Sequence, residues 1–214
     1  MKKLVLLALV MSVSLLSAQN PWGVYVSAGI SPESHPVNAD LIVNRHIPQE
    51  EFLFNMEHVK TQYFGGIQVR RDLGTNFFIG AGVTYTQRKT IYSMEYTMPR
   101  DDTYMEMEEI ENQLLLPVSI GVKLSIFEIT SGLSGIASLS KQSELTNIPG
   151  FVDHSPTFQM GWHAGIGINL NKVLLGVGFQ SALNRVCMGK TVNSQSLELR
   201  NVPGQCQLKI QYKF

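Results

Sequence analysis

The sequence has no excess of charge of either sign. Its 17 lysine and arginine residues are balanced by 17 aspartate and glutamate residues over 214 positions. Proteins that bind nucleic acid usually concentrate a basic excess on one surface, because they must neutralise phosphates. The balance therefore predicts that nucleic acid is not a partner.

After its first twenty residues, the sequence also lacks an apolar run that is long enough for a membrane-spanning helix. Such a helix needs about 20 consecutive apolar residues. The best candidate, 114–122, contains Pro117 and Gly121 and is followed by Lys123. We expect no transmembrane helix there.

The first nineteen residues have the layout of a secretory signal peptide. Lys2 and Lys3 form a positive region, an apolar stretch over 4–16 follows, and Ala18 and Gln19 end it. The apolar stretch is too short to span a bilayer as a helix. We predict that 1–19 is cleaved and that 20–214 forms one domain. An exported chain of this kind is either soluble or a membrane β-barrel, and periodicity separates the two.

Eight segments alternate between large apolar residues and small or polar residues. In 77–86, for example, Phe77, Ile79 and Val83 alternate with Gly80 and Gly82. Alternate residues of a β-strand point to opposite faces, so each segment would have one apolar face. The other seven segments are 22–30, 63–70, 114–124, 127–139 (in which Ile136 breaks the pattern), 158–170, 173–180 and 207–214.

The connections between these segments alternate between short and long. The short ones are 72–76, 125–126 and 171–172, and the long polar ones are 31–56, 95–103, 142–156 and 189–195. Soluble β-sandwiches also alternate, but outer-membrane barrels combine alternation with short periplasmic turns and long extracellular loops. The sequence therefore predicts an all-β fold: an eight-stranded antiparallel transmembrane β-barrel with that loop asymmetry and both chain ends on the periplasmic side. The hairpin formed by 77–94 and 104–124 is expected to extend beyond the membrane on the outer side.

Charged residues on the small face of these segments would point into the barrel. They are Arg70, Lys123, Glu128, His163, Lys209 and Lys213. One interpretation is a proton path or a ligand site, and the other is a network of ion pairs that fills the lumen. Because eight-stranded barrels leave no wide aqueous channel, we favour the network.

The expected loops contain further groups that can bear chemistry. The acidic residues of the second long loop and its flanks predict a solvated loop, with a bridging divalent cation as the alternative; they are Glu95, Asp101, Asp102, Glu106, Glu108, Glu109 and Glu111. Prolines suit a mobile first loop, whose His35 and His46 would be weak metal ligands. We predict no metal site and no cofactor.

Two cysteines, Cys187 and Cys206, stand on either side of the last long connection. If the last two strands pair so that residue numbers sum to about 386, Cys206 faces Gln180 and Cys187 faces Leu199. The seven-residue offset, at about 3.3 Å per residue, is too long for a disulfide. We expect two free thiols.

The end of the chain carries a family resemblance. The alternating segment 208–214 ends in Tyr212 and Phe214, which resembles the signal read by barrel-assembly machinery. With the Gly65-Gly66 pair, the run 114–123 and the segment 161–167, the chain resembles the porin-like or PorT-type outer-membrane β-barrel family of Bacteroidetes over about 22–214. The resemblance implies an integral outer-membrane location, with outer-membrane lipid, lipopolysaccharide and the assembly machinery as partners. Its PorT branch alone implies a role in protein secretion, with secretion-system proteins as partners.

Three functional hypotheses follow. The first is a non-enzymatic barrel with a structural, interaction or secretion-accessory role, acting through its outer loops or a periplasmic partner. The second is a lipid A-modifying enzyme, which would need a serine or histidine on the lipid-facing wall or outer rim. No Ser-His-acid grouping is recognisable from spacing, so we predict no catalytic residue. The third is a narrow solute channel.

Overall fold

The computed structural model describes residues 22–35, 41–44, 51–96, 104–183, 190–192, 195–196 and 204–214. The predicted signal peptide, His46, Asp101, Asp102 and Cys187 lie outside these residues. No helix in the described part of the chain is long and apolar enough to cross a membrane.

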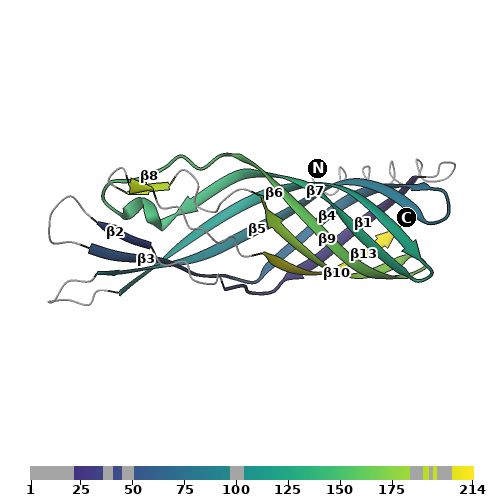
Figure 1. Cartoon of the computed structure of the whole chain (residues 1–214), viewed down its shortest axis with the longest axis horizontal. Helices are drawn as coiled ribbons and strands as arrows, with labels where there is room; N and C mark the ends of the chain where they lie inside the picture. Colours follow the sequence, from purple (N-terminus) through teal and green to yellow (C-terminus); the bar gives the residue numbers. More distant parts are fainter. Residues whose placement is uncertain are drawn as a thin grey trace, which may run out of the picture.

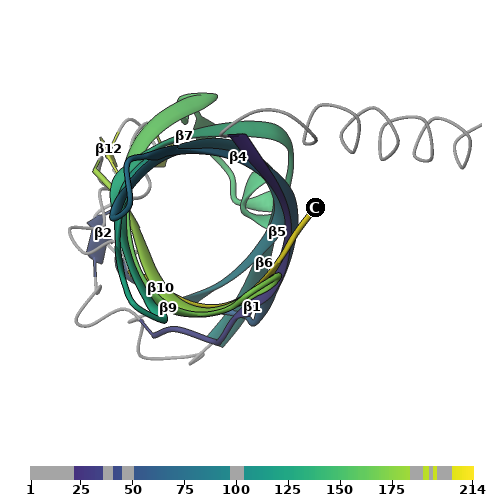
Figure 2. The same cartoon turned by 90° about the vertical axis from the view of Figure 1, so that its right-hand side faces the viewer.

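Eight long strands of one antiparallel sheet form a closed ring (Figure 2). Each pairs with two neighbours in the order β1–β4–β5–β6–β7–β9–β10–β13, and β13 pairs again with β1. The prediction of an all-β chain is confirmed. The strands are β1 (Trp22–Ser31), β4 (Gln62–Leu73), β5 (Phe77–Tyr96), β6 (Tyr104–Leu124), β7 (Phe127–Ser143), β9 (Phe158–Leu170), β10 (Val173–Ala182) and β13 (Gln205–Lys213).

Consecutive residues of the ring strands differ sharply in exposure, as the alternating pattern requires. Phe77 is 52% exposed, whereas the next residue, Phe78, is fully buried. The Phe78 ring fits inside because its cross-strand neighbour is Gly121, where a Cβ atom would collide with the ring. Large apolar side chains therefore cover the outside of the ring, while small, polar and a few aromatic side chains fill the inside.

Three tight turns lie together at one end of the ring. They contain Gly74, Ser125 and Asn171, each with a positive φ of 75°, 58° and 64° respectively. Glycine and asparagine tolerate this left-handed conformation better than most residues. Backbone hydrogen bonds link the turns to neighbouring strands, as from the Asn169 N–H to the Ile126 carbonyl (2.6 Å). The carboxyl end of the chain lies at this same end (Figure 1).

The first long connection is not only a polar loop, as we predicted for 31–56. It contains β2 (Leu41–Asn44) and β3 (Glu51–Val59), and β3 pairs with the outer half of β5. The prediction was wrong here because the alternation of β3 is interrupted. Phe54 and Met56 are buried, a register shift follows between Met56 and His58, and Val59 is buried again. Such a bulge hides a strand from any reading that depends on a period of two.

Two other predicted loops also contain regular structure. The connection 142–156 includes a short 3-10 helix, η1 (Glu144–Asn147), and β8 (Phe151–Asp153). The connection 189–195 includes β11 (Lys190–Val192), which pairs with β8 and with β12 (Gln195–Ser196) in a small second sheet. These strands are too short to leave a clear periodic signal.

The outer halves of β5, β6 and β7 continue past the ring and form an extension (Figure 1). An apolar core, which we call the extension core, lies between these strands, β3, η1 and β11. Its buried members are Phe54, Met56, Val59, Tyr92, Met94, Met107, Leu145, Ile148 and Val192. The molecule thus has a ring with an apolar exterior and an extension with an apolar interior.

Candidate functional site

A hydrogen-bonded ion pair crosses the interior of the ring. Arg70 on β4 donates from Nη1 to Glu128 Oε2 on β7 at 2.8 Å, and from Nη2 to Gln211 Oε1 on β13 at 2.6 Å. Asn169 on β9 donates to the other oxygen of Glu128 at 2.6 Å. Because β5 and β6 separate β4 from β7 in the ring, the pair joins two opposite walls. We call these four residues the Arg70 network.

Aromatic rings enclose the same guanidinium group. The Arg70 Cζ atom lies 4.4 Å from the centre of the Tyr25 ring and 4.9 Å from that of the Phe78 ring. Arg70 and Glu128 are each only 2% exposed. A buried ion pair offsets its lost hydration only when further hydrogen bonds complete it, and here Gln211 and Asn169 supply them. The network crosses the interior of the ring near its turn end.

The other predicted lumen residues have separate partners. Lys123 donates to Asp72 at 2.6 Å, and Lys213 lies 6.0 Å from the Tyr25 ring centre. His163 and Lys209 both line a small polar cavity of about 80 Å³ inside the ring. The structure therefore brings Arg70 and Glu128 into direct contact, whereas the other four residues have separate contacts.

A serine and a histidine meet inside the ring. Ser134 Oγ lies 2.8 Å from His163 Nδ1, and Ser134 is 2% exposed. Among the described residues, no carboxylate forms an ion pair with His163 to complete a triad. The pair also faces the ring interior rather than its outer wall, where a lipid-modifying enzyme would need its nucleophile.

A second set of charges, which we call the outer polar cluster, is buried in the extension. Lys190 on β11 donates to Glu109 Oε2 on β6 at 2.6 Å and to the Tyr92 hydroxyl on β5 at 3.3 Å. Lys141 on β7 lies 3.3 Å from the same Glu109 oxygen and 2.7 Å from Asp153 Oδ2 on β8. These five residues come from five strands, so the cluster ties the small second sheet to the extension.

The surroundings favour the charged forms of Glu109, Asp153 and Lys141. Burial alone would raise the pKa of Glu109, but the charges of Lys190 and Lys141 hold that pKa below its ordinary value. Burial would likewise raise the pKa of Asp153, but hydrogen bonds from Lys141 and Ser155 lower it to about 2. For Lys141, burial lowers the pKa, and the nearby Glu109 and Asp153 more than reverse this effect and raise it.

The prediction that the acidic residues form a solvated loop was wrong for Glu109. This side chain is 5% exposed and lies in the outer polar cluster. The cause is that β6 begins at Tyr104, so the acidic segment is a strand with one inward face rather than a loop. Glu95 and Glu106 are exposed, as expected for solvated charges, and Glu108 forms an ion pair with Lys89.

Sequence reasoning did not single out Tyr92, Lys141, Asp153 or Lys190. The alternation of 77–86, continued outward, would have placed Tyr92 on the inner face. Lys141 was hidden because a register shift between β6 and β7 reverses the faces beyond Leu139. Nothing in the sequence pattern marks Lys190, whose strand is three residues long.

The predicted residues at the carboxyl end lie on the outer wall of the ring. Tyr212 and Phe214 are 43% and 39% exposed, and their rings are 5.1 Å apart in an edge-on arrangement. Cys206 is a free, exposed thiol that pairs across the strands with Phe179, one position from the expected Gln180. The predicted state of Cys187 concerns a residue outside the described part of the chain.

Comparisons with known proteins give a likeness of structure rather than of sequence. No protein-family model and no curated protein matches the chain. Among solved structures, the chain is similar to the Yersinia pestis outer membrane protein Ail, whose backbone structure was determined in a phospholipid bilayer nanodisc. The match has a TM-score of 0.35 and 10% sequence identity, and it covers 89% of this chain and 99% of that one.

Proposed function

We propose that the chain is an integral outer-membrane β-barrel protein with a non-enzymatic, structural or interaction role. The observation that carries the proposal is the closed ring of strands with its apolar outer face. In lipid, every backbone N–H and C=O group must find a partner within the protein, and a closed sheet provides this. An apolar exterior around a polar interior is the reverse of a soluble β-sandwich and is typical of a transmembrane barrel.

The lengths of the shorter ring strands match the thickness of a bilayer. About 9–11 residues of a tilted strand cross a bilayer, and the shorter ring strands, such as β1 and β10, have 10 residues each. In this proposal the ring spans the membrane, the three tight turns face the periplasm, and the extension of β5, β6 and β7 stands outside the cell. The two polar clusters then lie at different depths, the Arg70 network within the membrane and the outer polar cluster above it.

The filled interior favours an interaction role over transport. The Arg70 network joins opposite walls, and the cavity beside it has a volume of about 80 Å³, which suits a few water molecules rather than a solute path. We therefore expect the purified protein to be silent in planar bilayers. A steady, reproducible conductance would favour the narrow channel instead.

The partners we propose are outer-membrane lipid, lipopolysaccharide and, through Tyr212 and Phe214, the barrel-assembly machinery. A secretion-accessory role is the finer form of the proposal, and only the sequence resemblance to the PorT-type family supports it. Crosslinking in intact cells tests it directly. Recovery of secretion-machinery components would support this role, and their absence among captured proteins would leave an interaction role of the outer extension alone.

Location and activity need separate experiments. We expect the protein to fractionate with the outer membrane and to migrate differently on gels before and after heating, because closed barrels resist detergent until heated. Recovery from the soluble periplasmic fraction would overturn the proposal. Mass spectrometry of lipid A from a deletion strain should show an unchanged profile, whereas a lost modification would point to an enzyme.

A further inference from the structure

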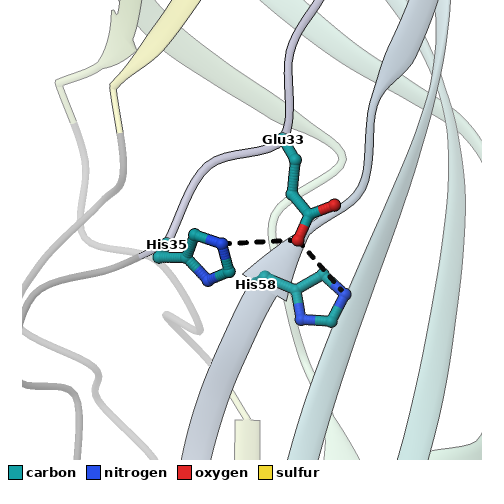
Figure 3. Close-up of side chains that lie close together, drawn as sticks. All are labelled: Glu33, His35 and His58. Carbon is teal, nitrogen blue, oxygen red and sulfur yellow. Dashed lines mark ion pairs between the residues drawn. The ribbon is translucent and has the colours of Figure 1, made fainter.

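Two histidines and a glutamate meet where the segment after β1 contacts β3 (Figure 3). His35 Nε2 lies 3.3 Å from Glu33 Oε1, and His58 Nε2 lies 3.9 Å from the same oxygen. The two imidazole rings are 5.6 Å apart between centres. One ligand atom from each residue lies within 4.8 Å of the other two. Neither the Arg70 network nor the outer polar cluster includes these side chains.

The backbone explains why these residues meet. Ser34 and Val59 form an antiparallel bridge, in which the Ser34 N–H donates to the Val59 carbonyl at 3.0 Å and the Val59 N–H donates to the Ser34 carbonyl at 2.9 Å. Side chains on either side of a bridged residue point to the opposite face. Val59 is 1% exposed and belongs to the apolar core, so its neighbour His58 faces away from that core, beside Glu33 and His35.

We propose that Glu33, His35 and His58 bind a divalent transition-metal ion, for which Zn²⁺ is the best match. Imidazole nitrogens and a carboxylate oxygen are common ligands of Zn²⁺, at about 2.0–2.2 Å. Two such ligands of a tetrahedral ion lie about 3.3 Å apart, which is the separation of His35 and Glu33. His58 Nε2 lies 3.9 Å from Glu33 Oε1 and must approach by about 0.6 Å to reach that separation, and its side chain is 25% exposed.

The composition and position of the site decide what the ion would do. Ca²⁺ and Mg²⁺ prefer oxygen ligands and would not select two imidazoles. Three protein ligands leave one position for water or for a side chain of a bound partner. The ion would fasten the segment after β1 to β3, and so fix the first outer connection against the extension.

Calorimetric titration of Zn²⁺ into the folded protein in detergent micelles, without a polyhistidine tag, tests the proposal. We expect one ion per chain, no displacement by excess Mg²⁺, and a loss of affinity of at least about tenfold in H58A and in E33Q, since even the removal of outer-shell partners costs that much. His154 is an exposed histidine of the same extension but not of this cluster. H154A is therefore the matched control and should bind as the unmodified chain does.

Each outcome has a clear consequence. Heat-dependent gel migration confirms that a variant is folded, so weaker binding by H58A with normal migration supports the site. Equal affinity of H58A and the unmodified chain, or an equal loss in H154A, would overturn it. The titration measures the affinity of the three side chains for Zn²⁺ and does not depend on the membrane location. The proposed function can therefore be wrong while the metal site is correct.

Discussion

At the scale of single residues, the most consequential feature is the charge of Arg70 inside the ring. Removing one partner of a buried ion pair leaves the other charge without compensation, which costs far more than the intact pair contributes. Pairs exposed to water behave differently, because solvent screens both charges. Arg70 with Glu128 is an example of the first kind, and Lys123 with Asp72 is an example of the second.

Glu128→Gln should lower the free energy of unfolding by about 3–5 kcal/mol, because it leaves the Arg70 guanidinium buried without an anion. Urea titration of the folded protein, followed by the fluorescence of Trp22 and Trp162, measures the change. Lys123→Gln is the matched control and should cost about 0–1 kcal/mol, since Asp72 is 41% exposed. Equal losses in the two variants would mean that the Arg70 network is not a buried ion pair.

At the scale of elements, the extension depends on charges and on apolar packing in separate places. The outer polar cluster joins β6, β7, β8 and β11 through Glu109, Lys141, Asp153 and Lys190. The extension core holds β3 against β5. Acid should weaken the attachment of β8 and β11 through the outer polar cluster. A cavity in the extension core should weaken the attachment of β3 to β5.

Acid should release β8 while the rest of the extension stays folded. The pKa of Asp153 is about 2 in the folded chain and about 3.9 in an unfolded one. Its contribution to stability is therefore complete above about pH 4 and is lost as the pH falls through about 2. The lowered pKa of Glu109 acts in the same direction.

Hydrogen exchange of the 151–153 peptide, corrected for intrinsic rates, measures this release. Between pH 4 and pH 2 the unmodified chain should lose protection there. Asp153→Asn should already show reduced protection at pH 7 and little further change on acidification, whereas Glu95→Gln, at an exposed position, should follow the unmodified chain. Loss of protection in Asp153→Asn with an unchanged acid response would assign the effect to other groups.

Met56→Ala should loosen β3 by opening a cavity in the extension core. Met56 is 1% exposed, and truncation of a buried methionine costs about 2–5 kcal/mol. Met105→Ala is the matched control, because Met105 lies in the same extension but is 40% exposed and should cost less than about 0.5 kcal/mol. Exchange of the β3 amides reports the difference, and similar rates in the two variants would mean that β3 does not depend on this core.

The same elements show where sequence reasoning works and where it stops. Alternation located the long strands of the ring, because one apolar face repeats over many residues. It missed β3 and gave no face to Lys141, because single-residue irregularities in pairing reverse the faces. It also assigned side chains to faces without identifying their partners. The contacts of Glu109 with Lys190 and of His35 with His58 join segments that no local pattern connects.

At the scale of the whole molecule, exposure to water and exposure to lipid have different energetic consequences. Val118 on β6 is 62% exposed and lies midway along the ring portion of its strand. Tyr104, at the outer start of the same strand, is 55% exposed. In a soluble protein both positions would accept a charge with little effect. In a barrel that crosses the membrane, only the second would.

Val118→Arg should therefore reduce the free energy of folding into lipid vesicles by about 2–4 kcal/mol, the cost of arginine on the lipid face near the bilayer midplane. Tyr104→Arg should change it by no more than about 0.5 kcal/mol, as is usual for an exposed site in water. Reversible urea titration of vesicle-folded protein measures both. Val118→Lys should repeat the effect, since the cost belongs to the charge and not to the guanidinium. If Val118→Arg and Tyr104→Arg were equally tolerated, the apolar exterior of the ring would not be in contact with lipid. The membrane-spanning orientation would then be wrong.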